Sequence, residues 1–159
     1  MSSHLLSLAI WVPIVGGIIV LALGSERRCA ARWISLAFAI AGFLVTIPLF
    51  TGFDAAKSGM QFVEMGSWIP RFNVSYFLGV DGISVLFVLL NSFITVLVVL
   101  AGWEVIEEKV AQYMAAFLIM SGLMNGIFSA LDAVLFYVFF EASLIPMYII
   151  IGVWGGPNR

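Results

Sequence analysis

A single acidic side chain stands inside a long apolar stretch, and it is the residue of this sequence best placed to do chemistry. Glu141 lies within residues 133–155, about 4.5 Å from the midpoint of that stretch at the helical rise of roughly 1.5 Å per residue. A carboxylate at that depth is costly unless it is paired or protonated. Burial disfavours its charge and a nearby cation favours it, so such a group can take up and release a proton. Glu141 is therefore a candidate proton carrier, and the alternative is a protonated Glu that only bonds a neighbouring helix.

Two residues near Glu141 could shape a path for protons. Pro146 cannot donate to the carbonyl of Ala142, so the helix is predicted to kink there and to leave that carbonyl free for water or a polar side chain. A packing kink without water is an equal alternative. Asp132 directly precedes the stretch, where it can cap the helix by accepting backbone N–H groups. A position at the entry or exit of a proton path is the other interpretation of Asp132.

The other polar and small residues in apolar stretches point to helix packing. Asn91, Asn125 and Gln112 are expected to form hydrogen bonds between helices. Gly122 and Gly126 are spaced four apart, a small-residue pattern that permits close approach of two helices. These residues predict architecture rather than catalysis.

The sequence contains one cysteine, Cys29, and one histidine, His4. A structural zinc, a haem or an iron–sulfur cluster needs a larger ligand set than these two residues supply. A Gly-rich loop that could cradle phosphates is also absent from the sequence. We therefore expect neither a cofactor nor a metal in this chain.

The composition places these residues in a membrane. Of 159 residues, 63% are hydrophobic and 10% are charged, whereas soluble domains are about half apolar and a quarter charged. The many aromatic residues exclude a disordered chain, and a net charge of −2 argues against a nucleic-acid partner.

Five apolar stretches are long enough to cross a hydrocarbon core, which takes about 20 helical residues. They are residues 5–23, 33–51, 83–102, 111–131 and 133–155. Backbone groups in lipid must bond within their own segment, so all five are predicted as helices. The predicted fold class is an all-α integral membrane protein, with residues 1–159 forming the amino-terminal part of one membrane domain.

The distribution of Lys and Arg predicts the orientation of the helices. Five of the seven cations lie in residues 24–32, 103–110 and 156–159, and the other two lie in residues 52–82. The cation-rich loops are expected in the cytoplasm, which places the N-terminus and the 52–82 loop outside.

The 52–82 loop is predicted to form a short extracytoplasmic hairpin over the helix ends, because apolar and polar residues alternate along it. The alternating apolar positions are Phe72, Val74 and Tyr76, with a weaker match at Met60 and Phe62. Gly66 and the Ile69-Pro70 step are the predicted turn residues. Asp81 is placed to cap the helix that follows.

Two motifs closely resemble one protein family. They are Tyr76-Phe-Leu-Gly-Val-Asp-Gly-Ile-Ser84 and Leu131-Asp-Ala-Val-Leu-Phe-Tyr-Val-Phe-Phe-Glu-Ala-Ser-Leu-Ile-Pro-Met-Tyr148, the latter followed by Gly152-Val-Trp-Gly155. Both are similar to the M chain of the proton-translocating NADH–quinone oxidoreductase (respiratory complex I), which is equivalent to mitochondrial chain 4. The resemblance covers the whole chain, which is expected to be an N-terminal fragment with about a third of the length of a family member.

The resemblance implies an antiporter-like bundle of inverted helix repeats, as in secondary transporters, in a bacterial inner membrane. In the family a Glu on the fifth helix pairs with a Lys on a later helix to gate protons. By motif position that Glu is Glu141, and the Lys would lie beyond Arg159. An acidic residue at the start of the same helix matches Asp132.

The implied partners are the other membrane subunits of complex I and the lipid bilayer. NADH, flavin, iron–sulfur clusters and quinone are expected in the partner subunits, so that this chain would carry protons but no redox chemistry.

Two other functions stay open. A related antiporter-like chain of a multisubunit cation/proton antiporter or of a membrane-bound hydrogenase would share the fold and the membrane Glu. The run from Phe140 to Trp154 fits the M chain better. A membrane scaffold protein without transport is the third interpretation, and the near-central position of Glu141 argues against it.

Overall fold

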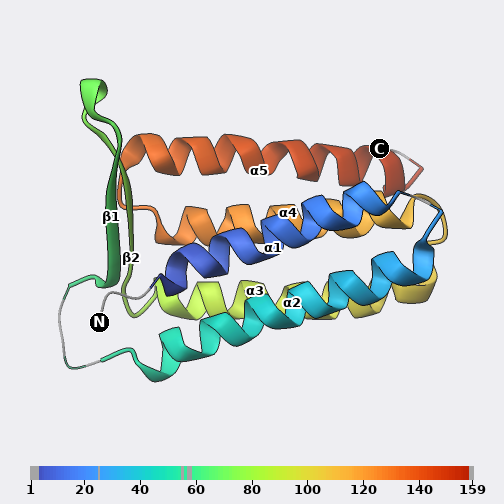
Figure 1. The fold of residues 1–159 in the computed structure, drawn as a ribbon, viewed down its shortest axis with the longest axis horizontal. Coiled ribbons are helices and arrows are strands. Elements are labelled where there is room, and N and C mark those ends of the chain that lie inside the picture. The colour runs from blue at the N-terminus through green and yellow to red at the C-terminus, as the bar shows by residue number, and fades with distance from the viewer. Residues whose placement is uncertain (1–3, 25, 55, 57–58, 158–159) are drawn as a thin grey trace.

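The computed structural model describes residues 4–24, 26–54, 56 and 59–157, and this part folds into five long helices and a β-hairpin (Figure 1). The helices are α1 (Leu5–Leu23), α2 (Arg28–Thr51), α3 (Ser84–Val105), α4 (Val110–Ser129) and α5 (Ala133–Trp154). All five are long and apolar enough to cross a membrane. The predicted all-α membrane fold class with a short hairpin is therefore confirmed.

The start of α2 and the end of α3 extend beyond the predicted apolar stretches. α2 begins at Arg28 rather than at residue 33, and α3 ends at Val105 rather than at residue 102. The two extended ends are joined by a hydrogen bond: Arg32 donates from Nη2 to the carbonyl of Ile106 at 3.1 Å. A prediction from apolar stretches alone does not include these terminal helical turns.

α4 ends earlier than predicted, at Ser129 rather than at residue 131. The next residues pair with the hairpin instead: Ala130 forms a β-bridge with Leu78, and Leu131 N–H donates to the carbonyl of Phe77 at 2.8 Å. Hydrogen bonds to a strand therefore replace the last helical turn.

α1 and α4 form the centre of the bundle, with α2 and α3 on one side and α5 on the other (Figure 1). A Cβ added at Gly122 of α4 would collide with the carbonyl oxygen of Ile10 in α1. A Cβ added at Gly126 would lie 2.8 Å from the ring of Phe139 in α5. The predicted small-residue pair thus gives close approach to two different helices, because small side chains let neighbouring backbones come near.

Apolar side chains pack in two clusters along the bundle. Nearer the hairpin the buried residues include Leu6, Leu49, Leu78, Val88 and Phe139, and at the other end they include Val20, Val99, Met114 and Leu118. Lipid tails are as apolar as these side chains, so association inside a membrane depends on close packing and on hydrogen bonds between helices.

A proline in α1 leaves a carbonyl without its helical donor, and a side chain of α4 bonds to it. Pro13 has no N–H group, so the carbonyl of Ala9 lacks the usual partner four residues later. Asn125 Nδ2 donates to this carbonyl at 2.9 Å, and Asn125 is fully buried. An unpaired carbonyl in hydrocarbon is costly, so Asn125 replaces the hydrogen bond that Pro13 removes.

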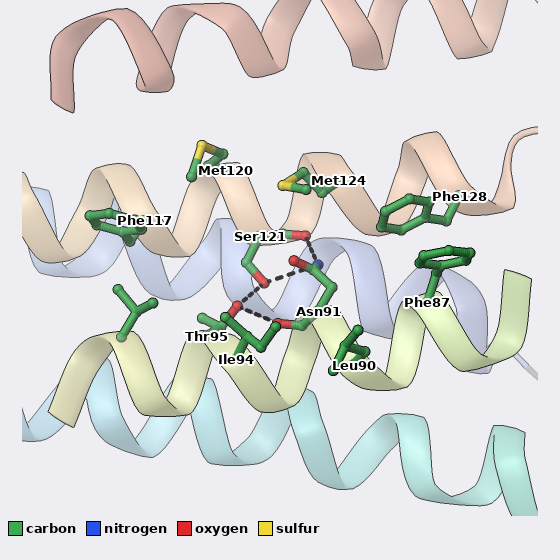
Figure 2. Close-up of a pocket in the computed structure, with 11 residues that line it drawn as sticks. Phe87, Leu90, Asn91, Ile94, Thr95, Phe117, Met120, Ser121, Met124 and Phe128 are labelled. Carbon is green, nitrogen blue, oxygen red and sulfur yellow. Dashed lines mark hydrogen bonds between the residues drawn. The ribbon is translucent and has the colours of Figure 1, made fainter. Parts of the chain in front are cut away.

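Asn125 also belongs to a polar cluster between α3 and α4. Asn91 Nδ2 donates to Asn125 Oδ1 and to the carbonyl of Ser121, both at 2.9 Å. Thr95 Oγ1 lies 2.7 Å from Ser121 Oγ and donates to the carbonyl of Asn91 at 2.8 Å. Figure 2 shows Asn91, Thr95 and Ser121 bonded to one another beside a cavity of about 250 Å³ with aromatic, aliphatic and Met walls. The predicted interhelical hydrogen bonds of Asn91 and Asn125 are confirmed.

The hairpin lies across the helix ends near the start of α1 (Figure 1). Its antiparallel strands are β1 (Gln61–Ile69) and β2 (Val74–Val80), joined by the short helical turn η1 (Pro70–Phe72). The predicted turn at Gly66 is wrong, since Gly66 pairs with Tyr76 inside the ladder. The chain reverses at η1, where Pro70 suits the helical turn and Asn73 takes a left-handed conformation with φ 57°.

A carboxylate fastens β1 to the start of α1. Glu64 accepts hydrogen bonds from Ser7 N–H at 3.0 Å and from the Ser7 hydroxyl at 2.6 Å. Ser7 lies in the first turn of α1, where N–H groups have no partner within the helix and a negative charge is favoured. Glu64 therefore caps α1 from a different part of the chain.

A second carboxylate fastens β2 to α5. Asp132 Oδ1 accepts hydrogen bonds from Val134 N–H at 2.9 Å and Leu135 N–H at 3.2 Å, and Oδ2 accepts one from Ser75 N–H at 3.1 Å. These bonds, the one from Ser75 above all, lower the pKa of Asp132 from its ordinary value of 3.8. The predicted helix cap is thus confirmed, and it also holds the hairpin.

A third carboxylate caps α3 and bonds to residues next to it in the chain. Asp81 Oδ1 accepts hydrogen bonds from Ser84 N–H at 2.8 Å and Ile83 N–H at 3.1 Å, as predicted. The bond from Ser84 is the main cause of a lowered pKa for Asp81.

We expect Asn125→Leu in the complete subunit to lower the free energy of unfolding by about 1–2 kcal/mol, because it leaves the Ala9 carbonyl unpaired. In a Pro13→Ala background the loss should be smaller, because the restored N–H at position 13 can bond to Ala9. Denaturant titration in mixed micelles of the parent, the two single variants and the double variant measures the coupling between positions 13 and 125. Thr95→Val is the control and should cost the same in both backgrounds, whereas an equal cost of Asn125→Leu in both would contradict the assignment.

We expect hydrogen-exchange protection of the Ser75 amide to depend on the charge of Asp132. The folded pKa of Asp132 is lowered, so its stabilising contribution is present above pH 3.8 and is lost as the pH falls through the lower, folded value. After correction for intrinsic exchange, protection should drop severalfold over that fall, and Asp132→Asn should lower it already at neutral pH. The Leu131 amide, which bonds to a carbonyl, is the internal control. Protection of Ser75 that is the same in both proteins would contradict this role.

Candidate functional site

Glu141 lies near the middle of α5, on the side of that helix turned away from α4. The buried residues of α5 are Leu135, Phe139, Ser143 and Pro146. At 3.6 residues per turn Glu141 falls on the opposite side of the helix, and it is exposed. The carboxylate is about 4 Å along the axis from the midpoint of α5. The bundle described here therefore leaves Glu141 open to whatever packs on the outer side of α5.

The Glu141 carboxylate has no cationic partner within the described residues. Among the described residues, the contact between a basic side chain and a carboxylate is that of His4 with Glu64 at the end of the bundle, where 3.5 Å separates Nδ1 and Oε1. A charge on Glu141 would need a cation from another segment or another subunit, since an unpaired carboxylate at this depth is costly.

Two tyrosines share the open side of α5 with Glu141, and the sequence analysis did not single them out. Tyr137 precedes Glu141 by one helical turn and Tyr148 follows it by two, so all three lie along one stripe. The side chains of Tyr137 and Tyr148 are 61% and 80% exposed. Their spacing of four and seven residues from Glu141 is the sequence signal that could have identified them.

Pro146 lies on the packed side of α5, opposite Glu141. With Ala142 it lines a cavity of about 390 Å³ between α1, α4 and α5, in which Gln112 is the polar residue. α5 continues as a helix through Pro146. Any water bonded to a carbonyl freed by Pro146 on this side would be separated from the Glu141 carboxylate by the helix.

Asp132 lies at the hairpin end of α5, about 14 Å along the helix axis from Glu141. Its two oxygens accept the three backbone hydrogen bonds described above. The structure therefore places the two predicted site residues on one helix without bringing them together.

The remaining polar residues predicted from the sequence lie elsewhere. Gln112 Oε1 is buried and has no hydrogen-bond partner among the described residues. Three further acids, which were not among the predicted site residues, are exposed at the end of the bundle away from the hairpin: Glu104, Glu107 and Glu108. In the described part of the chain, no three His, Cys, Asp or Glu residues are grouped so that they could hold a metal ion.

Comparisons with known proteins identify the family of the chain. A family model described as "NADH-ubiquinone oxidoreductase chain 4, amino terminus" matches residues 8–130. The chain is 46% identical to NADH-quinone oxidoreductase subunit M of Rhodobacter capsulatus, an alignment covering 98% of this chain and 31% of that protein. It is 43% identical to NADH-ubiquinone oxidoreductase chain 4 of Arabidopsis thaliana, with 97% and 31% covered.

A solved structure has the same fold. One chain of respiratory complex I from Thermus thermophilus with bound NADH superposes with a TM-score of 0.78 at 30% identity, covering 97% of this chain and 30% of that one. The chain thus spans about a third of the length of the relatives it matches. On the match over residues 8–130, the chain belongs to the NADH–ubiquinone oxidoreductase chain 4 family.

Proposed function

We propose that this chain is the amino-terminal part of a proton-translocating membrane subunit of NADH–quinone oxidoreductase, in which Glu141 takes up and releases the proton. The observation that carries the proposal is the position of the Glu141 carboxylate: near the middle of a membrane-spanning helix, on its open side, without a cation among the described residues. Membership of the chain 4 family supports the assignment to this complex.

The chemistry follows from depth and from a movable charge. A carboxylate far from water binds a proton more readily, and a cation brought close favours release of that proton. A partner cation that approaches and withdraws on the outer side of α5 would therefore switch Glu141 between its two states without any cofactor. The family resemblance assigns this cation to a Lys on a later helix.

Asp132, Tyr137 and Tyr148 lie along the same helix region as Glu141 and fit this proposal. Tyr137 and Tyr148 supply hydroxyl groups on the Glu141 stripe, and a hydroxyl can both donate and accept a hydrogen bond. Asp132 marks the hairpin end of the helix, where a path along α5 would reach water. Its lowered pKa supports a fixed charge at that end rather than a second proton carrier.

Electron transfer is proposed to belong to partner subunits. A single thiol and a single imidazole in the sequence do not make a ligand set for an iron–sulfur cluster or haem. NADH, flavin, iron–sulfur clusters and quinone would then be bound elsewhere in the complex, and this chain would contact the other membrane subunits.

We further propose a bacterial inner-membrane location with the N-terminus and the hairpin outside. Five of the seven Lys and Arg residues of the sequence fall in residues 24–32, 103–110 and 156–159, and such residues favour the cytoplasm.

We expect Glu141→Gln to leave assembly of the complex intact while reducing proton pumping by about a hundredfold or more, the range of a lost acid–base group. Gln keeps the shape and hydrogen bonding of Glu but cannot ionise. Glu141→Asp should keep part of the activity because the acid survives. Pumping is measured in vesicles with the reconstituted complex, beside NADH–quinone turnover.

Glu107→Gln is the matched control for this measurement, since Glu107 is exposed at the bundle end and its loss should leave pumping unchanged. If the Glu141→Gln enzyme pumps at the parental rate, Glu141 has only a structural role.

We expect a membrane-impermeant thiol reagent applied to intact spheroplasts to label a Trp68→Cys variant in the hairpin but not the native Cys29. Both residues are exposed, at opposite ends of the bundle. Opening the membrane should add labelling of Cys29. Labelling of Cys29 in intact spheroplasts, without labelling at position 68, would reverse the proposed orientation.

A further inference from the structure

A polar cavity of about 480 Å³ opens where the hairpin meets the start of α1. Its lining includes His4 and Ser7 from the start of α1, and Glu64 and Tyr76 from the hairpin. The Glu64 side chain is 8% exposed, whereas His4 is 78% exposed. The cavity therefore has a nearly buried carboxylate in its wall and an imidazole at its mouth.

An apolar cavity of about 400 Å³ adjoins the polar one and shares Gly66 and Tyr76 with it. Trp11 lines it from α1, and Leu135, Val138 and Phe139 line it from the first turns of α5. These residues lie deeper along the helices than Ser7 and Asp132 do. The two cavities together change from polar to apolar in the direction that leads from the membrane surface to its interior.

The Glu64 carboxylate can accept more hydrogen bonds than it receives. Ser7 N–H and the Ser7 hydroxyl occupy two acceptor positions, and a carboxylate offers about four. The Ser7 hydroxyl also contacts Tyr76 OH at 2.9 Å, to which Trp11 Nε1 donates at 3.1 Å. A cationic donor in the polar cavity would therefore meet a preorganised acceptor.

The charges at this end of the bundle favour a cation. Residues 52–82 and 132 contain four acids, Asp54, Glu64, Asp81 and Asp132, but only two bases, Lys57 and Arg71. Among the described residues that line the polar cavity, the imidazole of His4 lies nearest to this carboxylate, with its Nδ1 3.5 Å from Glu64 Oε1. A headgroup with only negative charge would face a buried carboxylate.

We propose that the two cavities bind a phospholipid whose headgroup carries an ammonium group. The ammonium sits at Glu64, and an acyl chain follows Trp11, Val138 and Phe139 along α1 and α5. The bilayer supplies such lipids to the surface of membrane-spanning helices, and the combined cavity size suits a small-molecule site. This inference does not depend on proton translocation.

The test compares two lipids that differ in the headgroup. The purified complex with the complete subunit is placed in phosphatidylglycerol nanodiscs with a trace of phosphatidylethanolamine bearing a photoreactive acyl chain. A phosphatidylglycerol probe with the same chain is the matched lipid. Peptides with Trp11 and Val138 should be labelled about tenfold more by the ethanolamine probe, the factor expected for one charge-assisted hydrogen bond.

Two variants separate the headgroup from the chain. Glu64→Gln keeps an acceptor for Ser7 but removes the charge, so the two probes should label about equally. Val138→Trp fills the apolar cavity and should reduce labelling by both probes while Glu64 is intact. Unchanged exchange of the Ser75 amide verifies that the hairpin stays in place, and Glu107→Gln at the other end should behave as the parent.

Equal labelling of the parent by both probes would overturn the proposal, and so would a preference that survives Glu64→Gln or labelling that Val138→Trp does not reduce. Absence of labelling by either probe would mean that protein covers the cavities, which also overturns it.

Discussion

The bundle depends on one contact in which α4 completes the hydrogen bonding of α1. In hydrocarbon every backbone polar group needs a partner within the protein, and Pro13 removes the donor for the Ala9 carbonyl. Asn125 supplies the replacement, and it can reach the carbonyl because Gly122 lets the two backbones approach. The same Asn125 side chain joins Asn91 on α3. A single polar residue thereby fixes three helices relative to one another, in a solvent where apolar side chains alone give little preference.

Glu64, Asp132 and Glu141 differ in the backbone N–H groups that they accept. Glu64 and Asp132 each accept N–H groups from the first turn of a helix, and each ties that helix to the hairpin. At Asp132 the N–H donors lower the pKa of the carboxyl group. Glu141 receives no such donors within the described residues and lies mid-helix. In the proposed function, Glu141 is therefore the acid whose charge a cation outside the described residues would control.

The hairpin contacts both helices that Glu64 and Asp132 cap. It bonds to the start of α1 through Glu64 and to the start of α5 through Asp132, so the helix that carries Glu141 is anchored at one end. The cavities between hairpin, α1 and α5 lie beside both anchors. The proposed lipid would contact the same carboxylate that caps α1. It would therefore help to hold the hairpin against the helix ends.

Features that depend on residues close together in the chain could be predicted before the structure was known. Five helices follow from stretches of about 20 apolar residues, the caps at Asp81 and Asp132 act on N–H groups two and three residues later, and the depth of Glu141 follows from its place in its stretch. The tertiary structure decided the rest. Asn125 meets a carbonyl 116 residues away. Of the two predicted turn sites, the hairpin uses Ile69-Pro70 and not Gly66, because the register depends on pairing between strands. The open side of α5 could not be predicted, since the stripe of Tyr137, Glu141 and Tyr148 does not by itself show whether a neighbouring helix covers it.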